Sequence, residues 1–210
     1  MLDGQAVAGM VPLMPEAAGA GLPPVWSSYV TVDDIDATAA KARELRAAWL
    51  MESIQTPGAG SMFVAVDPVG AAISFWQADQ HVGAGVFNIP VAMSRNELAC
   101  RDVDAAKAFS TELPGGGVDV QHYRDFTYTV VKVGDRVNGG IYDMVGRLSD
   151  VVPAHWFVWF SLDGTDAAVE RVHALGGSVQ RESWDSSSGR MAVATDLQGP
   201  ALGVITKDRQ

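Results

Sequence analysis

The last third of this chain repeats its first third. Trp26, Asp33 and Asp36 recur as Trp156, Asp163 and Asp166, each 130 positions later, and Asp67 and Gly70 recur as Asp196 and Gly199, 129 positions later. A period this long indicates a duplicated domain and not a solenoid of short repeats. The second copy is preceded by a long segment, whereas the first has almost none. Any fold for this chain must therefore explain an uneven repeat.

Composition places the chain among folded globular proteins. With 48% hydrophobic and 19% charged residues over 210 positions, it can bury a core as one large domain or two small ones. A net charge of −10 without a basic run argues against a nucleic acid partner. The single cysteine, Cys100, excludes an internal disulfide and a cysteine-based zinc site. Without a signal-like start or a long apolar run, we expect a soluble cytoplasmic protein with no membrane partner.

Local patterns in the first copy predict a strand, a helix and three strands. Residues 26–32 alternate between two faces, as a strand does, and Asp33 and Asp34 then offer a helix cap. An Ala-rich helix is predicted over residues 35–49. Apolar runs at 50–54 and 62–66, the Asp-Pro-Val-Gly turn at 67–70 and a strand at 71–76 complete a βαβββ unit.

The same order of elements occurs twice more. The second unit has predicted strands at 96–101, 126–133 and 137–144, a helix ending near 113 and a glycine turn at 115–117; the third has strands at 155–162, 178–181, 190–195 and 201–205, with a helix over 165–175. We therefore predict an α+β fold of tandem βαβββ units.

The N-terminal segment is the exception to this order. Residues 5–14 are predicted to form a strand that stops at Pro12, and residues 7–10 align with 138–141, the last strand of a unit. We predict an incomplete first domain over residues 1–80, made of this orphan strand and one unit, and a complete second domain over 86–208. The hypothesis that follows is an N-terminally clipped chain lacking most of one unit.

Two motifs carry a resemblance to a known family. Val32-Asp33-Asp34 precedes a helix, and both residues 67–70 and residues 196–199 (Asp-Leu-Gln-Gly) precede the last strand of a unit. Paired units with these motifs resemble the vicinal oxygen chelate superfamily of glyoxalases, bleomycin-resistance proteins and extradiol dioxygenases. Trp26 with residues 29–34, Trp76-Gln77 and Asn96-Glu97-Leu98 resemble the actinobacterial two-domain members that are labelled glyoxalase-like or hydroxylase. The resemblance implies that two units pair to form a cup for a small molecule, and a homodimer is one option because members often exchange units.

The residues at the positions of the family's metal ligands are not metal ligands here. Metal-dependent members place a His or Gln seven or eight residues before the motif Asp, where this chain has Trp26 or Ser27, Ser94 or Arg95, and Trp156 or Phe157. Their Glu on the last strand would fall near Ser74 and Gly203. Carboxylate and imidazole are the usual side chains for such ions. We therefore expect no metal and no other cofactor.

Aromatic residues on the cup face are the candidate ligand-binding groups. By alternation, Val30, Val32, Val158, Phe160 and Leu162 face the helices, whereas Ser27, Tyr29, Thr31, Phe157, Trp159 and Ser161 face the cup. Tyr29, Trp76, Phe157 and Trp159 are the ligand-binding candidates, since such a cup suits a flat, partly apolar molecule. The alternative is that these rings only pack between sheets.

Two residues are the candidates for acid–base chemistry. Glu97 is predicted on the cup face among apolar neighbours, where it is either a general base or a structural Glu paired with Arg95 or another base. His155 is either a group at the mouth of the cup or a surface His. Cys100 is predicted to face the helix as a buried small residue.

Three functional hypotheses follow. The first is a protein that binds a small, partly apolar molecule in the cup without a metal. The second is a glyoxalase-like lyase, a dioxygenase or a hydroxylase-type enzyme that uses Glu97 and His155 or an atypical metal site. The third is a remnant whose open sheet favours aggregation or dimerisation.

Overall fold

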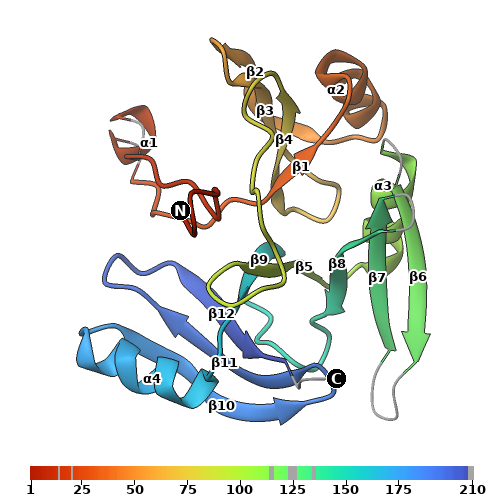
Figure 1. Ribbon diagram of the computed structural model, residues 1–210. Helices are drawn as coiled ribbons and strands as arrows, with labels where there is room; N and C mark the ends of the chain where they lie inside the picture. Colours follow the sequence, from red (N-terminus) through yellow and green to blue (C-terminus); the bar gives the residue numbers. More distant parts are fainter. Residues whose placement is uncertain (14, 20, 114–115, 123–126, 134–135, 208–210) are drawn as a thin grey trace. The chain divides into compact units, whose positions relative to one another are not determined.

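The computed structural model describes the whole chain except residues 14, 20, 114–115, 123–126, 134–135 and 208–210 (Figure 1). Three βαβββ units follow one another, which confirms the predicted α+β class. The first unit comprises β1 (Tyr29–Thr31), α2 (Ile35–Glu44), β2 (Ala48–Thr56), β3 (Gly60–Val66) and β4 (Ala72–Ala78). The second comprises β5 (Met93–Cys100), α3 (Val103–Glu112), β6 (Gly116–His122), β7 (Thr127–Val133) and β8 (Arg136–Asp143). The third comprises β9 (His155–Ser161), α4 (Thr165–Ala174), β10 (Ser178–Ser186), β11 (Gly189–Thr195) and β12 (Ala201–Thr206).

Each unit builds the same four-stranded arrangement. Its first and last strands pair in parallel, and the two middle strands continue the sheet in antiparallel fashion, giving the orders β1-β4-β3-β2, β5-β8-β7-β6 and β9-β12-β11-β10. A parallel pair needs a crossover, which the helix after the first strand supplies. The repeat in the sequence is therefore a repeat of sheet topology.

The chain divides into two compact units. The first contains residues 1–26, 84–95 and 157–210, and the second contains residues 27–83 and 96–156. The predicted boundaries at 1–80 and 86–208 stay a prediction, because compactness does not test which repeats descend from one duplicated domain. Within the described residues, no helix is long and apolar enough to span a lipid bilayer.

Helix starts follow the predicted capping pattern. Asp34 and Asp102 accept hydrogen bonds from the backbone N–H groups of Ala37 and Ala105, at 2.8 and 2.9 Å. Gly164 stands at the corresponding place before α4 and makes no such bond. Two of the three helices in the βαβββ units therefore carry the side-chain cap that the motif predicts.

The end of α2 corrects the predicted helix over 35–49. The helix stops at Glu44, and Arg46 takes a left-handed backbone conformation with φ of 65° before β2 begins at Ala48. Gly176 has the same role after α4, with φ of 80°. The prediction failed because an Arg gives no sign of a left-handed helix exit, whereas a Gly does.

Buried clusters confirm the predicted faces of several strands. Val30 and Val32 pack with residues of α2, and Leu162 packs with Val169 of α4. Cys100 is fully buried beside Ala106 of α3, as predicted. The opposite faces of these strands are therefore the ones turned away from the helices.

Two predicted elements are wrong. Among the described residues of 5–14 there is no strand: Gln5 makes one isolated bridge to Leu2, and α1 (Pro15–Gly19) follows. A strand needs a partner, and this segment pairs with none of the described strands. The predicted glycine turn is also wrong for Gly116 and Gly117, which pair with Val133 and Lys132 as the start of β6; residue 115 lies outside the described residues.

Candidate functional site

Three of the sequence-predicted site residues occupy the same position in the three repeats. Tyr29 pairs with Ser74, Glu97 with Gly140 and Trp159 with Gly203, each pair joining the first and last strands of a unit. The side chain on the first strand is large or charged, and its partner on the last strand is Ser or Gly. This position lies on the sheet face opposite the helix, and its side chain differs from one repeat to the next.

In the first compact unit, Trp159 covers the backbone of Gly203. Trp159 is 4% exposed, and a Cβ placed on Gly203 would collide with atoms of its indole ring. Glycine is required here because the ring lies directly against the strand. The Trp159 side chain is thus fixed on this face of β9 and β12.

Other aromatic side chains gather around Trp159. Phe157 and Trp184 approach it edge to face, with ring centroids 5.3 and 6.2 Å away. Met191 and Ile205 complete the buried part of this group. The set Phe157, Trp159, Trp184, Met191 and Ile205 is called the aromatic face below.

Two arginines lie over the rings of the aromatic face. The guanidinium carbon of Arg95 is 5.4 Å from the centroid of Trp159, and that of Arg181 is 3.7 Å from the centroid of Trp184. In these cation–π contacts each guanidinium lies over the electron-rich face of an indole ring, so positive charge adjoins the aromatic face. The indole Nε1 of Trp159 is buried and has no hydrogen-bond partner among the described residues. A ligand with aromatic and anionic parts would suit these groups.

In the second compact unit, Glu97 lies against Tyr128. The Tyr128 hydroxyl donates a 2.7 Å hydrogen bond to Oε2 of Glu97, which is 9% exposed. The Tyr128 ring also occupies the space that a Cβ on Gly140 would need. Leu98 and Cys100 pack on the helix side, so Glu97 lies on the opposite face, as predicted.

His155 lies at the start of β9, also in the second compact unit. Its Nδ1 is 2.9 Å from the carbonyl oxygen of Pro153, and the residue is half-buried. Arg101 holds the preceding loop by donating to the carbonyl oxygens of Val152 and Ser149, at 2.8 and 2.7 Å. The imidazole is therefore attached to an ordered loop, and its catalytic role stays a prediction.

Tyr29 and Trp76 lie on the open face of the first βαβββ unit. Tyr29 is 48% exposed on β1, whereas Trp76 is 9% exposed and donates from Nε1 to the carbonyl oxygen of His81 at 2.8 Å. Their helix-side neighbours Phe63 and Phe75 stack in the core. Tyr29 is thus the more exposed of the two, and the ligand-binding role of both residues stays a prediction.

The two positions of the family's last-strand Glu do not fit a divalent metal. Gly203 brings no donor, and Trp159 fills the space that a side chain there would need. Ser74 is 3% exposed and offers only a hydroxyl. Within the described residues, no three His, Cys, Asp or Glu side chains are grouped as metal ligands would be. We derive no chemical step through a metal.

Several residues of these sites were missed by the sequence predictions. Tyr128 is 31 positions from Glu97 in the chain, and Trp184 lies on β10, beyond the predicted strand at 178–181. The spacing of the V-x-D motifs places residues 29, 97 and 159 in register, which was the available signal for their equivalence. No comparable signal marks Tyr128 or Trp184, because their contacts depend on how β7 and β10 pair.

Fold and site define a class of small α+β proteins that are built of repeated βαβββ units and carry their candidate site residues on the sheet face opposite each helix. The chain is 37% identical over 210 residues to a protein of Mycobacterium tuberculosis provisionally named glyoxylase CFP32, covering 97% of this chain and 77% of that protein. It is 30% identical over 185 residues to the anthracycline biosynthesis protein DnrV of Streptomyces peucetius, covering 88% and 66%. No family profile matches the sequence.

A solved structure agrees with this class. The Mn(II)-bound glyoxalase of Novosphingobium aromaticivorans superposes with a TM-score of 0.58 at 17% identity, over 85% of this chain. The chain spans 61% of the length of that glyoxalase. The chain belongs to the vicinal oxygen chelate superfamily of glyoxalases and dioxygenases, as the sequence motifs indicated.

Proposed function

We propose that this protein binds a small aromatic molecule, with an acidic substituent, against the aromatic face of β9, β10, β11 and β12, without the divalent metal of its metal-dependent relatives. The observation that carries the proposal is the arrangement of Phe157, Trp159 and Trp184 with Arg95 and Arg181 on one side of a single sheet. Phe157 and Trp184 are half-buried, so their rings give apolar contact area beside the buried Trp159, and the arginines complement an anion.

The relatives named for anthracycline biosynthesis support an aromatic ligand. Anthracyclines are polycyclic aromatic molecules, which match a flat apolar surface better than an aliphatic acid does. The inference concerns the class of ligand, because those relatives are about 30% identical to this chain.

The test is a titration of the purified protein with anthraquinone-2-sulfonate, in which binding is measured by tryptophan fluorescence and by calorimetry. Trp184→Ala and Arg181→Ala should each weaken binding roughly tenfold, since each removes one contact worth about 1–2 kcal/mol. Arg171→Ala is the matched control, because Arg171 lies on α4, on the other side of the same sheet. Equal affinities for Arg181→Ala and Arg171→Ala would refute binding at the aromatic face.

The metal-free part of the proposal has a separate test. Elemental analysis of protein purified without chelators should find no stoichiometric Mn, Fe, Ni or Zn. One equivalent of a divalent metal that survives gel filtration would contradict it, whatever the outcome of the ligand titration.

An enzyme is the second candidate, and the Tyr128–Glu97 hydrogen bond favours it. A buried carboxylate next to a phenol can accept a proton from an acidic substrate and return it. If the protein turns over a glyoxalase or dioxygenase substrate, Glu97→Gln should abolish turnover while Tyr128→Phe shifts its pH profile. Full activity of Glu97→Gln would remove Glu97 from any catalytic role.

A further inference from the structure

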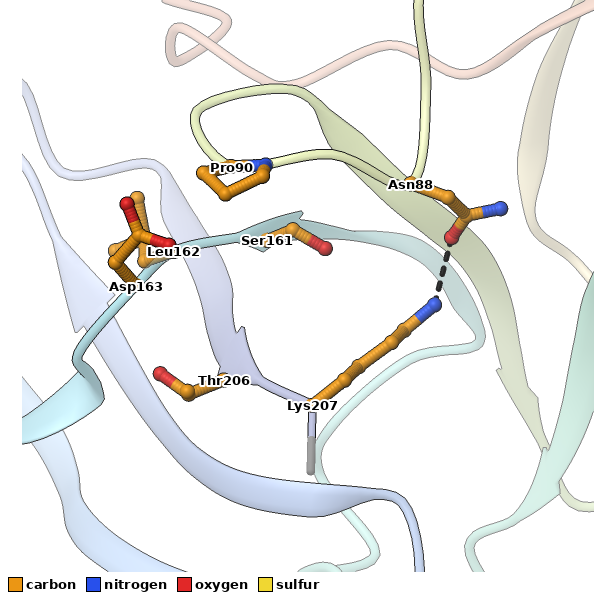
Figure 2. A pocket seen from close by; sticks show the side chains of 7 residues that line it. All are labelled: Asn88, Pro90, Ser161, Leu162, Asp163, Thr206 and Lys207. Atoms are coloured by element: carbon orange, nitrogen blue, oxygen red, sulfur yellow. Dashed lines mark hydrogen bonds between the residues drawn. The ribbon is translucent and has the colours of Figure 1, made fainter. Parts of the chain in front are cut away.

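A cavity of about 380 Å³ opens in the first compact unit, where β9 and β12 end side by side. Figure 2 shows the side chains around it, which come from the last residues of these two strands, from the residues that follow them and from the loop before β5. The lining residues are Asn88, Pro90, Ser161, Leu162, Asp163, Thr206 and Lys207. None of them belongs to the aromatic face, so this cavity is a separate feature.

Lys207 brings positive charge to one side of the cavity. Its ammonium donates a 2.6 Å hydrogen bond to Oδ1 of Asn88, as Figure 2 shows, and no carboxylate among the described residues forms an ion pair with it. Burial and the nearby Arg95 lower the pKa of Lys207. An anion in the cavity would relieve this repulsion between two cations.

Ser161 supplies a hydroxyl that lacks a partner. The residue is 6% exposed, and its Oγ makes no hydrogen bond to any described residue. Its backbone is fully used, because its N–H donates to Ala92 and its carbonyl accepts from Val91, at 2.9 and 2.7 Å. A buried hydroxyl in this state is costly, so a bound group that accepts its proton would be favoured.

The hydroxyl of Thr206, which also lines the cavity, already donates a hydrogen bond within the protein. Oγ1 of Thr165 donates to the carbonyl oxygen of Arg190 at 2.7 Å, so its single proton is in use. The 3.0 Å contact between Thr206 and Thr165 therefore has Thr206 as donor. Lys207 and Ser161 are left as the two donors that can serve a ligand.

We propose that this cavity binds the carboxylate of a small organic acid, with the Lys207 ammonium and the Ser161 hydroxyl each donating to it. Figure 2 shows the Ser161 hydroxyl directed toward the side where Lys207 and Asn88 meet. A carboxylate offers two oxygens and one charge, which matches two donors and one cation. Asp163 also lines the cavity, and its charge disfavours a phosphate dianion.

Butyrate is the probe, with 1-butanol as its neutral counterpart and inorganic phosphate as the competing anion, because an acid without a ring does not suit the aromatic face. Binding is measured by amide chemical-shift changes in two-dimensional NMR of the whole chain. Butyrate should shift amides of residues 88–92, 161–163 and 206–207, while 1-butanol and phosphate should not. Lys207→Met should weaken butyrate binding roughly tenfold or more, and Asp163→Asn should strengthen it.

Lys132→Met is the matched control, because Lys132 is bonded to Asp119 in the second compact unit. Equal losses from Lys207→Met and Lys132→Met, tighter binding of phosphate than of butyrate, or no shifts with butyrate would each overturn the proposal. Ser161→Ala gives a readout without a ligand: removal of an unpaired buried hydroxyl should raise the melting temperature. A lower melting temperature for this variant would mean that the hydroxyl is already bonded, which also overturns it.

The outcome is independent of the proposed function. Arg181→Ala should leave butyrate binding in the cavity unchanged, and Lys207→Met should leave anthraquinone-2-sulfonate binding at the aromatic face unchanged. Either proposal can therefore be refuted without affecting the other.

Discussion

Replacement of Asp67 by Asn should remove one source of pH dependence from the stability of this protein. Asp67 is 4% exposed in the turn between β3 and β4, and burial raises the pKa of its carboxyl from 3.8 to about 6. Hydrogen bonds from the backbone N–H groups of Val69 and Ala71, at 3.0 and 2.8 Å, lower the pKa, but burial outweighs them.

The direction of the effect follows from the two protonation states. A carboxyl whose pKa is raised in the folded protein holds its proton more tightly there than in the unfolded chain. Its stabilising contribution is complete below pH about 4 and is lost as the pH rises through about 6. A difference of about two pKa units corresponds to roughly 3 kcal/mol of unfolding free energy between these limits.

The assay is urea unfolding of both proteins at intervals from pH 4 to pH 8. The readout is the difference in unfolding free energy between Asp67→Asn and the parent, because the contributions of other groups cancel in it. This difference should grow by roughly 3 kcal/mol in favour of Asp67→Asn as the pH rises. Asp196→Asn, in the exposed turn of the third unit, is the control. A difference that stays constant with pH would refute the reasoning.

Three further predictions concern single positions. Arg46→Gly should stabilise the protein by about 1 kcal/mol in chemical denaturation, since it relieves a left-handed Arg, and Gly176→Ala should cost a similar amount. Cys100 should resist iodoacetamide in the native state at pH 8 and react in urea, because burial raises its pKa to about 12; rapid native labelling would contradict this. Gly203→Ala should cost about 1–3 kcal/mol and change the near-ultraviolet circular dichroism of Trp159, whereas Gly117→Ala, in open space, should change neither.

Local chemistry explains why much of the fold was predictable. Alternation of apolar residues fixes the faces of Val30 and Val32, and Asp34 caps α2 through one hydrogen bond within the same turn. These signals act over a few residues, so they are visible in the sequence. The start of β6 was missed for the converse reason: Gly116 and Gly117 favour a turn locally, and pairing with β7 overrides that preference.

The sites were less predictable because their contacts join distant parts of the chain. Glu97 was predicted to be either a general base or a structural Glu paired with Arg95 or another base, and neither alternative pointed to its hydrogen bond from Tyr128 on β7. Lys207 meets Asn88 across 119 positions, and the unpaired state of Ser161 depends on what surrounds its hydroxyl. Sequence patterns assign a residue to a face of a strand, but its partners there are set by strand pairing and loop position.

The glycines opposite the site residues limit how this fold could gain or lose a metal. At Gly203 and Gly140 an aromatic ring lies where a side chain on the last strand would begin. A carboxylate at position 203 therefore requires a smaller residue at position 159 as well, and each change alone is unfavourable: Gly203→Glu collides with the ring, and Trp159→Ala leaves a cavity above a bare strand. The double variant Gly203→Glu with Trp159→Ala should consequently be more stable than the sum of the two single effects. Simple additivity of the measured unfolding free energies would show that ring and glycine are not coupled.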